Sequence, residues 1–148
     1  MKRDKRIKYT KLLENKGISE NTNACIDLAT GDYFGLLDHD DVLHESALFE
    51  MAKAIEEENA DFLYSDEAKF SGAIEEVTDF TFKSGFGKDE LRSHNYICHF
   101  TVFSKELLKT LGICFRPEFD GSQDHDLVLR LTENAKKIKH ISKILYYW

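Results

Sequence analysis

A short apolar run that ends in three closely spaced aspartates constrains this chain more than any other feature. Residues 33–37 have the length and bulk of a buried strand, and Asp38, Asp40 and Asp41 follow where that strand is expected to end. Neighbouring carboxylates repel one another by about 1 kcal/mol in water and about 4 kcal/mol at an effective dielectric constant of 20. A divalent cation, Mg²⁺ or Mn²⁺, prefers carboxylate oxygens and shares its shell with phosphates, so the pattern predicts a metal or phosphate site.

A second interpretation of the same aspartates is helix capping. Asp40 or Asp41 could cap a helix that follows, because acidic side chains bind the unpaired amides at a helix N-terminus. Capping would account for one of the three carboxylates. The sequence alone leaves both interpretations open.

Length and composition predict one folded domain over residues 1–148. A hydrophobic content of 42% is enough for a sizeable core. The sequence shows no apolar run of transmembrane length and no signal-peptide pattern, so we expect a cytoplasmic location. The three cysteines are widely spaced, which fits a reducing compartment and forms no metal-binding motif.

The net charge of −7 is distributed unevenly along the chain. Residues 38–79 carry fourteen acidic side chains and two lysines, which argues against a nucleic-acid partner. A polyanionic ligand bound there would need a cation to bridge the repulsion. Residues 1–16 carry seven basic side chains and two acidic ones. This basic start could contact anionic lipids at the inner face of the membrane or could be a solvated surface.

Predicted strands alternate with predicted helices along the chain. We expect strands at residues 6–13, 33–38, 61–65, 97–103 and 139–147. We expect helices at 19–30, 43–59, 105–111 and from 122 onward, with a hairpin tip at 71–72 and a loop through residue 93. Ser19 and Ser104 are expected to be the N-caps of the first and the third of these helices. This alternation predicts an α/β fold with a mixed, mostly parallel sheet flanked by helices. In such sheets ligands bind beyond the carboxyl ends of strands, where residues 38–41 and the pair Asp66 and Glu67 are expected.

Asp124 is the second carboxylate of interest. In the helix opened by Ser122, it shares a face with apolar residues three, four and seven positions later. A carboxylate on a core-facing stripe is costly unless it faces a cleft, so Asp124 is either a general base or an aspartate satisfied by backbone amides. Asp126 is expected to form a surface pair with Arg130. Asn95 and His99 could line the same cleft, although a lone histidine is often a satisfied core or surface residue.

Several segments, in order, resemble family 2 inverting glycosyltransferases of the GT-A fold. The resemblance is closest to a subgroup that assembles bacterial surface polysaccharides, including O-antigen and rhamnan. It covers nearly the whole chain. The segments that carry it are Asn15-Lys16-Gly17-Ile18-Ser19, Leu28-Ala29-Thr30-Gly31-Asp32-Tyr33, Leu36-Leu37-Asp38-His39-Asp40-Asp41, Tyr64-Ser65-Asp66-Glu67, Asn95-Tyr96-Ile97-Cys98-His99 and Gly121-Ser122-Gln123-Asp124-His125-Asp126-Leu127.

The resemblance implies a role for each candidate residue. Asp40 would ligate Mn²⁺ or Mg²⁺ on the diphosphate of a nucleotide-sugar donor, and Asp38 would contact the ribose or assist the metal. Asp124 would be the base that deprotonates the hydroxyl of a glycan or lipid-linked acceptor. On the donor side the resemblance also implies Asn15, Lys16, Asp66 and Glu67, and on the acceptor side Asn95 and His99.

Two departures from the family pattern are visible. Family members open with an apolar strand and a short turn that build the nucleoside pocket, and nothing before Arg6 supplies them. We therefore expect the family domain without its first strand-helix-strand portion. The family also tends to carry a Tyr-His-Trp-Arg-like run, whereas this chain has Tyr146-Tyr147-Trp148, so a third metal ligand is not assigned.

Two other functions fit parts of the sequence. Asp38, Asp40 and Val42 also satisfy the motif of haloacid-dehalogenase phosphatases, although that fold places the motif on its first strand and here it follows the second predicted strand. The chain could also be a catalytically inert fragment that only binds a metal-diphosphate. Metal-dependent nucleotide binding and sugar transfer separate these possibilities.

Overall fold

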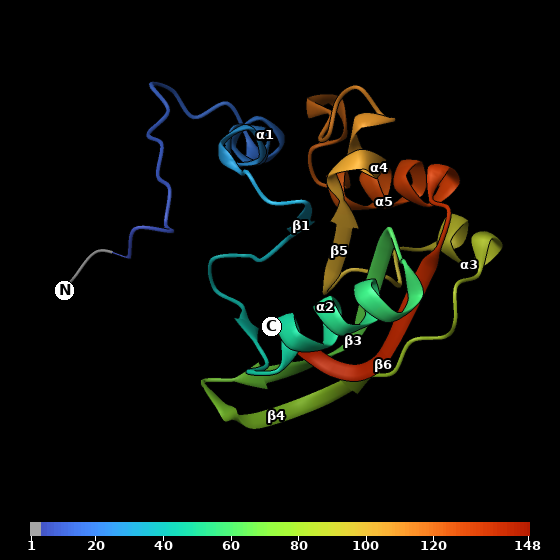
Figure 1. The fold of residues 1–148 in the computed structure, drawn as a ribbon. Coiled ribbons are helices and arrows are strands. Elements are labelled where there is room, and N and C mark those ends of the chain that lie inside the picture. Colours follow the sequence, from blue (N-terminus) through green and yellow to red (C-terminus); the bar gives the residue numbers. More distant parts are fainter. Residues whose placement is uncertain (1–3) are drawn as a thin grey trace.

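The computed structural model describes residues 4–148 and contains a mixed six-stranded sheet with helices on both faces (Figure 1). The strands follow the order β1-β5-β3-β6-β2, and β4 pairs with the distal part of β3. Their bounds are Tyr33–Gly35 for β1, Val42–Leu43 for β2, Phe62–Ser71 for β3, Ala73–Thr81 for β4, Thr101–Ser104 for β5 and Ile138–Tyr147 for β6. The predicted α/β class with a mixed sheet is confirmed.

The expected predominance of parallel pairs is wrong for the described strands. Only β3 and β6 run parallel, whereas β1–β5, β2–β6, β3–β4 and β3–β5 are antiparallel. The reason is the hairpin of β3 and β4, whose predicted tip at residues 71–72 is confirmed. This hairpin extends β3 to Ser71, six residues beyond its predicted end, so Asp66 and Glu67 lie within a strand and not at its carboxyl end.

Residues 4–148 form five α-helices, α1 (Ile18–Leu28), α2 (Ala47–Glu58), α3 (Lys88–Ser93), α4 (Lys105–Lys109) and α5 (Gln123–Asn134), and a 3₁₀ turn spans Pro117–Phe119. The predicted cap of α4 is confirmed, because Ser104 Oγ accepts a hydrogen bond of 3.0 Å from the Leu107 amide. Ser19 is not the cap of α1; it lies buried in the first turn, where Asp120 accepts hydrogen bonds from its amide and hydroxyl. In the described part of the chain, no helix combines the length and apolar character needed to cross a bilayer.

The helix-capping interpretation of the acidic turn is wrong. Helix α2 begins at Ala47, later than predicted, because Val42 and Leu43 pair with β6 as a short strand. Ser46 occupies the N-cap position of α2, and Asp40 and Asp41 lie before β2, too far upstream to cap the helix. Their carboxylates therefore need another explanation.

The predicted strand at residues 6–13 is absent from the described chain. This segment is exposed and extends away from the sheet before α1 begins (Figure 1). A strand needs a neighbour for its ladder of hydrogen bonds, and alternation of residue types alone does not supply one. Helix α3 is the opposite case, because a loop was expected and the structure has a short, largely exposed helix whose Leu91 is buried.

Alternate residues of the central strands contribute their side chains to two apolar clusters, one on each face of the sheet. Phe62, Tyr64 and Phe103 face a cluster that includes Leu127 and Leu131 of α5. Leu63, Val102 and Tyr146 face the opposite cluster, which Ala47 and Met51 of α2 complete. The period of two along the strands thus produces a three-layer arrangement.

Asp126 is buried in the described structure, which corrects the expected surface pair. Its carboxylate binds both Arg116 and Arg130, with a distance of 2.7 Å between Asp126 Oδ2 and Arg130 Nη2. Burial opposes ionisation of Asp126, but the hydrogen bonds from the two guanidinium groups outweigh it and lower the pKa below its usual range. These contacts tie α5 to the segment that precedes the 3₁₀ turn.

We expect Asp126→Asn to lower the free energy of unfolding by about 3 kcal/mol at pH 7, because two guanidinium groups lose their partner. The folded-state pKa is lowered, so the wild-type advantage is present above the usual aspartate pKa and disappears as the pH falls through the lowered value. Denaturant titration between pH 3 and 7 measures this. Glu133→Gln, on an exposed face of the same helix, is the control. Equal stability of the two variants would contradict the assignment.

Candidate functional site

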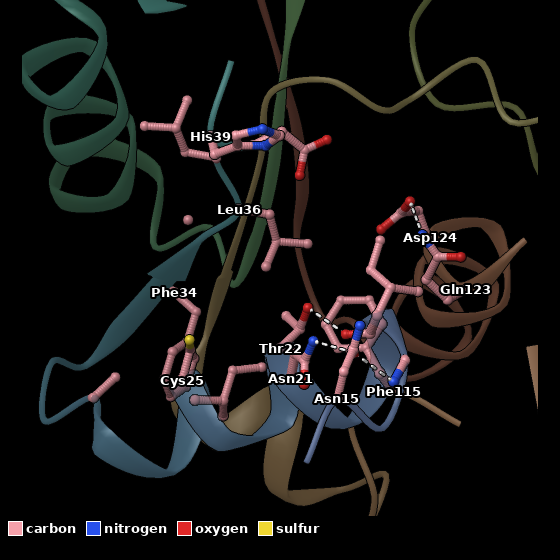
Figure 2. A pocket seen from close by; sticks show the side chains of 17 residues that line it. Asn15, Asn21, Thr22, Cys25, Phe34, Leu36, His39, Phe115, Gln123 and Asp124 are labelled. Atoms are coloured by element: carbon pink, nitrogen blue, oxygen red, sulfur yellow. Dashed lines mark hydrogen bonds between the residues drawn. The ribbon is translucent and has the colours of Figure 1, made fainter. Parts of the chain in front are cut away.

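A cavity of about 780 Å³ lies between α1, β1, the acidic turn of residues 38–41 and the start of α5. Polar groups come from Asn15, Asn21 and Thr22 on one wall, and apolar groups include Phe34, Leu36 and Phe115. Asp38 and Asp124 both line the cavity. Figure 2 shows Asn21, Thr22 and Cys25 projecting from α1, and Gln123 and Asp124 together at the start of α5. The cavity therefore joins two of the predicted acidic positions, which are far apart in sequence.

The three aspartates of the turn have different surroundings. The Asp38 carboxylate makes no hydrogen bond within residues 4–148. Asp40 is 73% exposed, and its Oδ1 lies 3.3 Å from His39 Nδ1. Asp41 instead accepts a hydrogen bond from the Tyr146 hydroxyl. One carboxylate is thus used by the protein, and two remain available for a ligand.

The chemistry of these two carboxylates decides whether a divalent cation fits. Within the described residues, no group of three His, Cys, Asp or Glu side chains could hold a metal ion. Mg²⁺ is often held by only one or two carboxylates, with substrate phosphates and water completing its shell. Asp38 and Asp40 therefore fit an ion shared with a diphosphate and do not fit a metal held by protein ligands alone.

Asp124 combines a place on the cavity wall with a raised pKa. Burial raises the pKa of its carboxyl, the charge of Asp38 raises it further, and His99 opposes both effects. Gln123 Nε2 donates a hydrogen bond of 2.9 Å to Asp124 Oδ2 and so orients the carboxylate. A cavity-facing carboxylate with raised proton affinity can accept a proton from a bound hydroxyl.

Asn95 and His99 lie on the loop between α3 and β5. The His99 amide donates to the Glu67 carboxylate, and its ring stacks on Tyr146 with centroids 4.9 Å apart. The buried Oδ1 of Asn95 has no hydrogen-bond partner among residues 4–148. The electrostatic influence of His99 on Asp124 places this loop near that carboxylate, but contact with an acceptor stays a prediction.

Asp66 and Glu67 are buried in β3 and bind other protein groups. Asp66 Oδ1 accepts hydrogen bonds from the Lys83 amide at 2.9 Å and from His140 Nε2 at 2.7 Å. Glu67 accepts from Lys83 Nζ at 2.9 Å and from Trp148 Nε1 at 3.1 Å. The predicted location at a strand end is wrong, and direct binding of a donor by these two side chains stays a prediction.

The loop before α1 separates its two predicted donor-site residues. Asn15 lines the cavity, and its Oδ1 accepts hydrogen bonds from the Gly17 amide at 3.1 Å and Asn21 Nδ2 at 3.2 Å. Lys16 lines a different hollow of about 540 Å³, beside Glu20 and Asp27. Donor binding by either residue stays a prediction.

Three residues near the site were missed by sequence reasoning. Gln123 has a local signal, because it directly precedes Asp124 at a helix start. Lys83 and Tyr146 have none, since their partners are distant in sequence. The Lys83 side chain is 1% exposed, burial lowers the pKa of its ammonium group, and Glu67 counteracts that effect. Its Nζ also donates to the carbonyl groups of Ile97 and His99, which fixes the loop that carries His99.

Comparison with known families decides the classification. Residues 1–112 match the family model of glycosyl transferase family 2. The chain belongs to glycosyl transferase family 2. Membership confirms the predicted family and the enzyme class of transferase, and it does not favour the phosphatase alternative.

Two curated relatives align with nearly all of this family 2 chain. The uncharacterised protein y4gI of Sinorhizobium fredii is 37% identical over 150 residues, covering 98% of this chain and 16% of that protein. The O-antigen biosynthesis protein RfbC of Myxococcus xanthus is 35% identical over 146 residues, covering 98% of this chain and 11% of that protein. The chain thus spans less than a fifth of the length of either relative.

A solved structure confirms the fold of this family 2 chain. Residues 1–349 of TarS from S. aureus superpose with a TM-score of 0.72 at 22% identity, covering 90% of this chain and 40% of that one. The same TarS region in complex with UDP-GlcNAc gives a TM-score of 0.72. At this identity the similarity shows the fold, and the predicted GT-A architecture is confirmed.

We expect Asp124→Asn to stabilise the protein at pH 7, since it removes a charge that burial disfavours. The folded-state pKa is raised, so the cost of the ionised carboxylate is present at neutral pH and disappears below the usual aspartate pKa. The expected gain is about 1 kcal/mol, or about 2–4 °C in Tm, in a buffer with chelator. Thermal unfolding from pH 3 to 8 measures it. Asp126→Asn, two residues along the same helix, should change Tm in the opposite direction, and a loss of stability in both variants would refute this assignment.

Proposed function

We propose that this chain transfers a sugar, with inversion at the anomeric carbon, from a nucleoside-diphosphate sugar to a hydroxyl of a glycan or lipid-linked acceptor in cell-surface polysaccharide biosynthesis. The observation that carries the proposal is that one cavity is lined both by Asp38 and by the half-buried Asp124, whose pKa burial raises. Family membership and the similarity to RfbC, an O-antigen biosynthesis protein, support it. The TarS complexes with UDP and UDP-GlcNAc support a nucleotide-sugar donor.

The reaction divides between the two acidic positions. Asp124 accepts the proton of the acceptor hydroxyl, and the hydroxyl oxygen forms a bond to the anomeric carbon. The bond between that carbon and the donor phosphate oxygen breaks, and the nucleoside diphosphate leaves with the electron pair. Asp38 and Asp40 would hold Mn²⁺ or Mg²⁺ together with the donor diphosphate, and the ion would supply positive charge to the leaving group.

The electrostatics of the cavity support this division of roles. A diphosphate that approached Asp38 and Asp40 alone would be repelled, because the residues of the described chain that line the cavity include no lysine or arginine. A cation held by Asp38 and Asp40 would offset this repulsion. Asp124 is neighboured by Gln123, which presents an amide donor without a competing charge.

The exposed basic segment before α1 supports a place near a membrane surface. Lys5, Arg6 and Lys11 are exposed, and such segments gain about 1 kcal/mol per basic residue at anionic lipid headgroups. In this proposal the segment contacts the inner face of the membrane and brings the cavity close to a lipid-linked acceptor.

Calorimetric titration with uridine or deoxythymidine diphosphate tests the donor site. We expect binding with Mn²⁺, little binding with a chelator, and at least a tenfold loss of affinity in Asp40→Ala, because a charge-assisted metal contact is removed. Glu57→Ala, an exposed carboxylate on α2, is the control and should bind as the wild type does. Nucleotide binding that chelator leaves unchanged would count against a shared cation.

A further inference from the structure

We propose that Tyr146 is a positioning residue that fixes the acidic turn of residues 38–41 relative to the loop that carries His99. The proposal rests on the proposed function, because the turn that Tyr146 contacts supplies Asp38 to that cavity. The observation behind it is that one fully buried side chain contacts both the turn with the donor-side carboxylates and the loop beside Asp124.

The Tyr146 hydroxyl uses its donor and an acceptor position on the same turn. It donates its hydrogen to the Asp41 carboxylate and accepts a hydrogen bond of 3.2 Å from the Asp38 amide. These two contacts join the first and last residues of the turn to β6. The backbone bond of 3.3 Å from the Asp41 amide to the Asp38 carbonyl closes the turn on itself.

The Tyr146 ring provides the second connection. It stacks on the His99 ring with centroids 4.9 Å apart and an interplanar angle of 19°, and its centroid lies 5.9 Å from that of the Phe100 ring. His99 is close enough to Asp124 for its charge to affect that carboxyl. The backbone of the same loop is also held by β3 and by Lys83. The His99 amide donates a hydrogen bond to the Glu67 carboxylate, and Lys83 Nζ donates one to the His99 carbonyl.

The sheet leaves Tyr146 little freedom to move. Within β6 it is paired with Leu43 of β2 on one side and with Glu67 of β3 on the other. A rigid anchor is needed here because the carboxylates of the turn repel one another and would spread apart if the backbone could relax. The Tyr146 hydroxyl donates a hydrogen bond to the Asp41 carboxylate and so holds the turn closed. The carboxylates of Asp38 and Asp40 remain available to a ligand.

The chain provides a matched control in Tyr64. This residue is also fully buried in the sheet. Its hydroxyl donates a hydrogen bond of 2.8 Å to the Ser84 carbonyl, and its ring stacks on the His140 ring with centroids 4.8 Å apart. It therefore matches Tyr146 in burial, hydrogen bonding and ring stacking, but it contacts neither the acidic turn nor His99. A change to phenylalanine at either position removes one buried hydroxyl and keeps the ring.

The test compares Tyr146→Phe with Tyr64→Phe and uses Mn²⁺ with uridine or deoxythymidine diphosphate as the probe. We expect Tyr146→Phe to weaken binding about tenfold and to speed hydrogen exchange of the Asp38 amide, since the hydroxyl held a charged group. With a sugar donor, its KM should rise by a similar factor while kcat stays within about twofold, because the ring still supports His99. Tyr64→Phe should keep wild-type affinity and wild-type exchange at Asp38.

The outcomes separate the two proposals. If the wild type binds neither diphosphate, the proposed function fails, and exchange at Asp38 alone decides whether Tyr146 holds the turn. If wild type and Tyr146→Phe bind equally, or if both tyrosine variants weaken binding to the same extent, the positioning role is overturned and the proposed function stands. Asp41→Ala removes the carboxylate that accepts the hydrogen bond from the Tyr146 hydroxyl, so it should weaken binding similarly. If Tyr146→Phe does not fold, Asp41→Ala tests the positioning role in its place.

Discussion

The parallel pairing of β3 with β6 is the constraint on which the rest of this structure depends. The two strands have ten residues each and form the centre of the sheet. Their register places Tyr146 beside Glu67, so the end of β6 meets the network that holds the His99 loop. The antiparallel pairing of β2 with the same end of β6 brings the acidic turn to Tyr146. A shift of one residue in this register would turn Tyr146 to the other face of the sheet and separate the turn from its anchor.

The carboxylates of the molecule divide into those that the fold satisfies and those that it leaves available. Asp126 binds two guanidinium groups and its pKa is lowered, whereas Asp124, two residues earlier, has a raised pKa and one amide donor. Asp41 is bound by Tyr146, whereas the Asp38 carboxylate has no hydrogen bond among the described residues. Asp38 and Asp124 line one cavity, and the ionised Asp124 carboxylate costs stability because burial disfavours its charge.

Local features could be predicted from the sequence, and features set by distant partners could not. The acidic turn, the Ser104 cap, the hairpin tip at residues 71–72 and the helix that carries Asp124 depend on neighbouring residues, and all four are present. The length of β3 depends on its pairing with β4, and the false strand at residues 6–13 depended on a neighbour that the described chain does not supply. The role of Asp41 was hidden because its partner lies 105 residues away.

In the candidate site too, local patterns predicted some residues, and contacts with distant partners could not be predicted. Asp38 and Asp124 were predicted from local patterns, and the structure brings them to one cavity. Asp66 and Glu67 were expected at a strand end, but they lie within β3 and bind Lys83, His140 and Trp148, which no local pattern connects to them. A buried lysine such as Lys83 is especially hard to anticipate, because lysine is rarely buried unless it is paired.

The most direct test of the central claim is to measure sugar transfer and donor binding together in Asp124→Asn. The claim is that Asp124 removes the acceptor proton while a separate group of carboxylates holds the donor. It predicts that transfer falls by about 10²–10⁴-fold while the affinity for nucleoside diphosphate with Mn²⁺ stays at the wild-type value. Transfer at the wild-type rate, or a parallel loss of donor affinity, would contradict it.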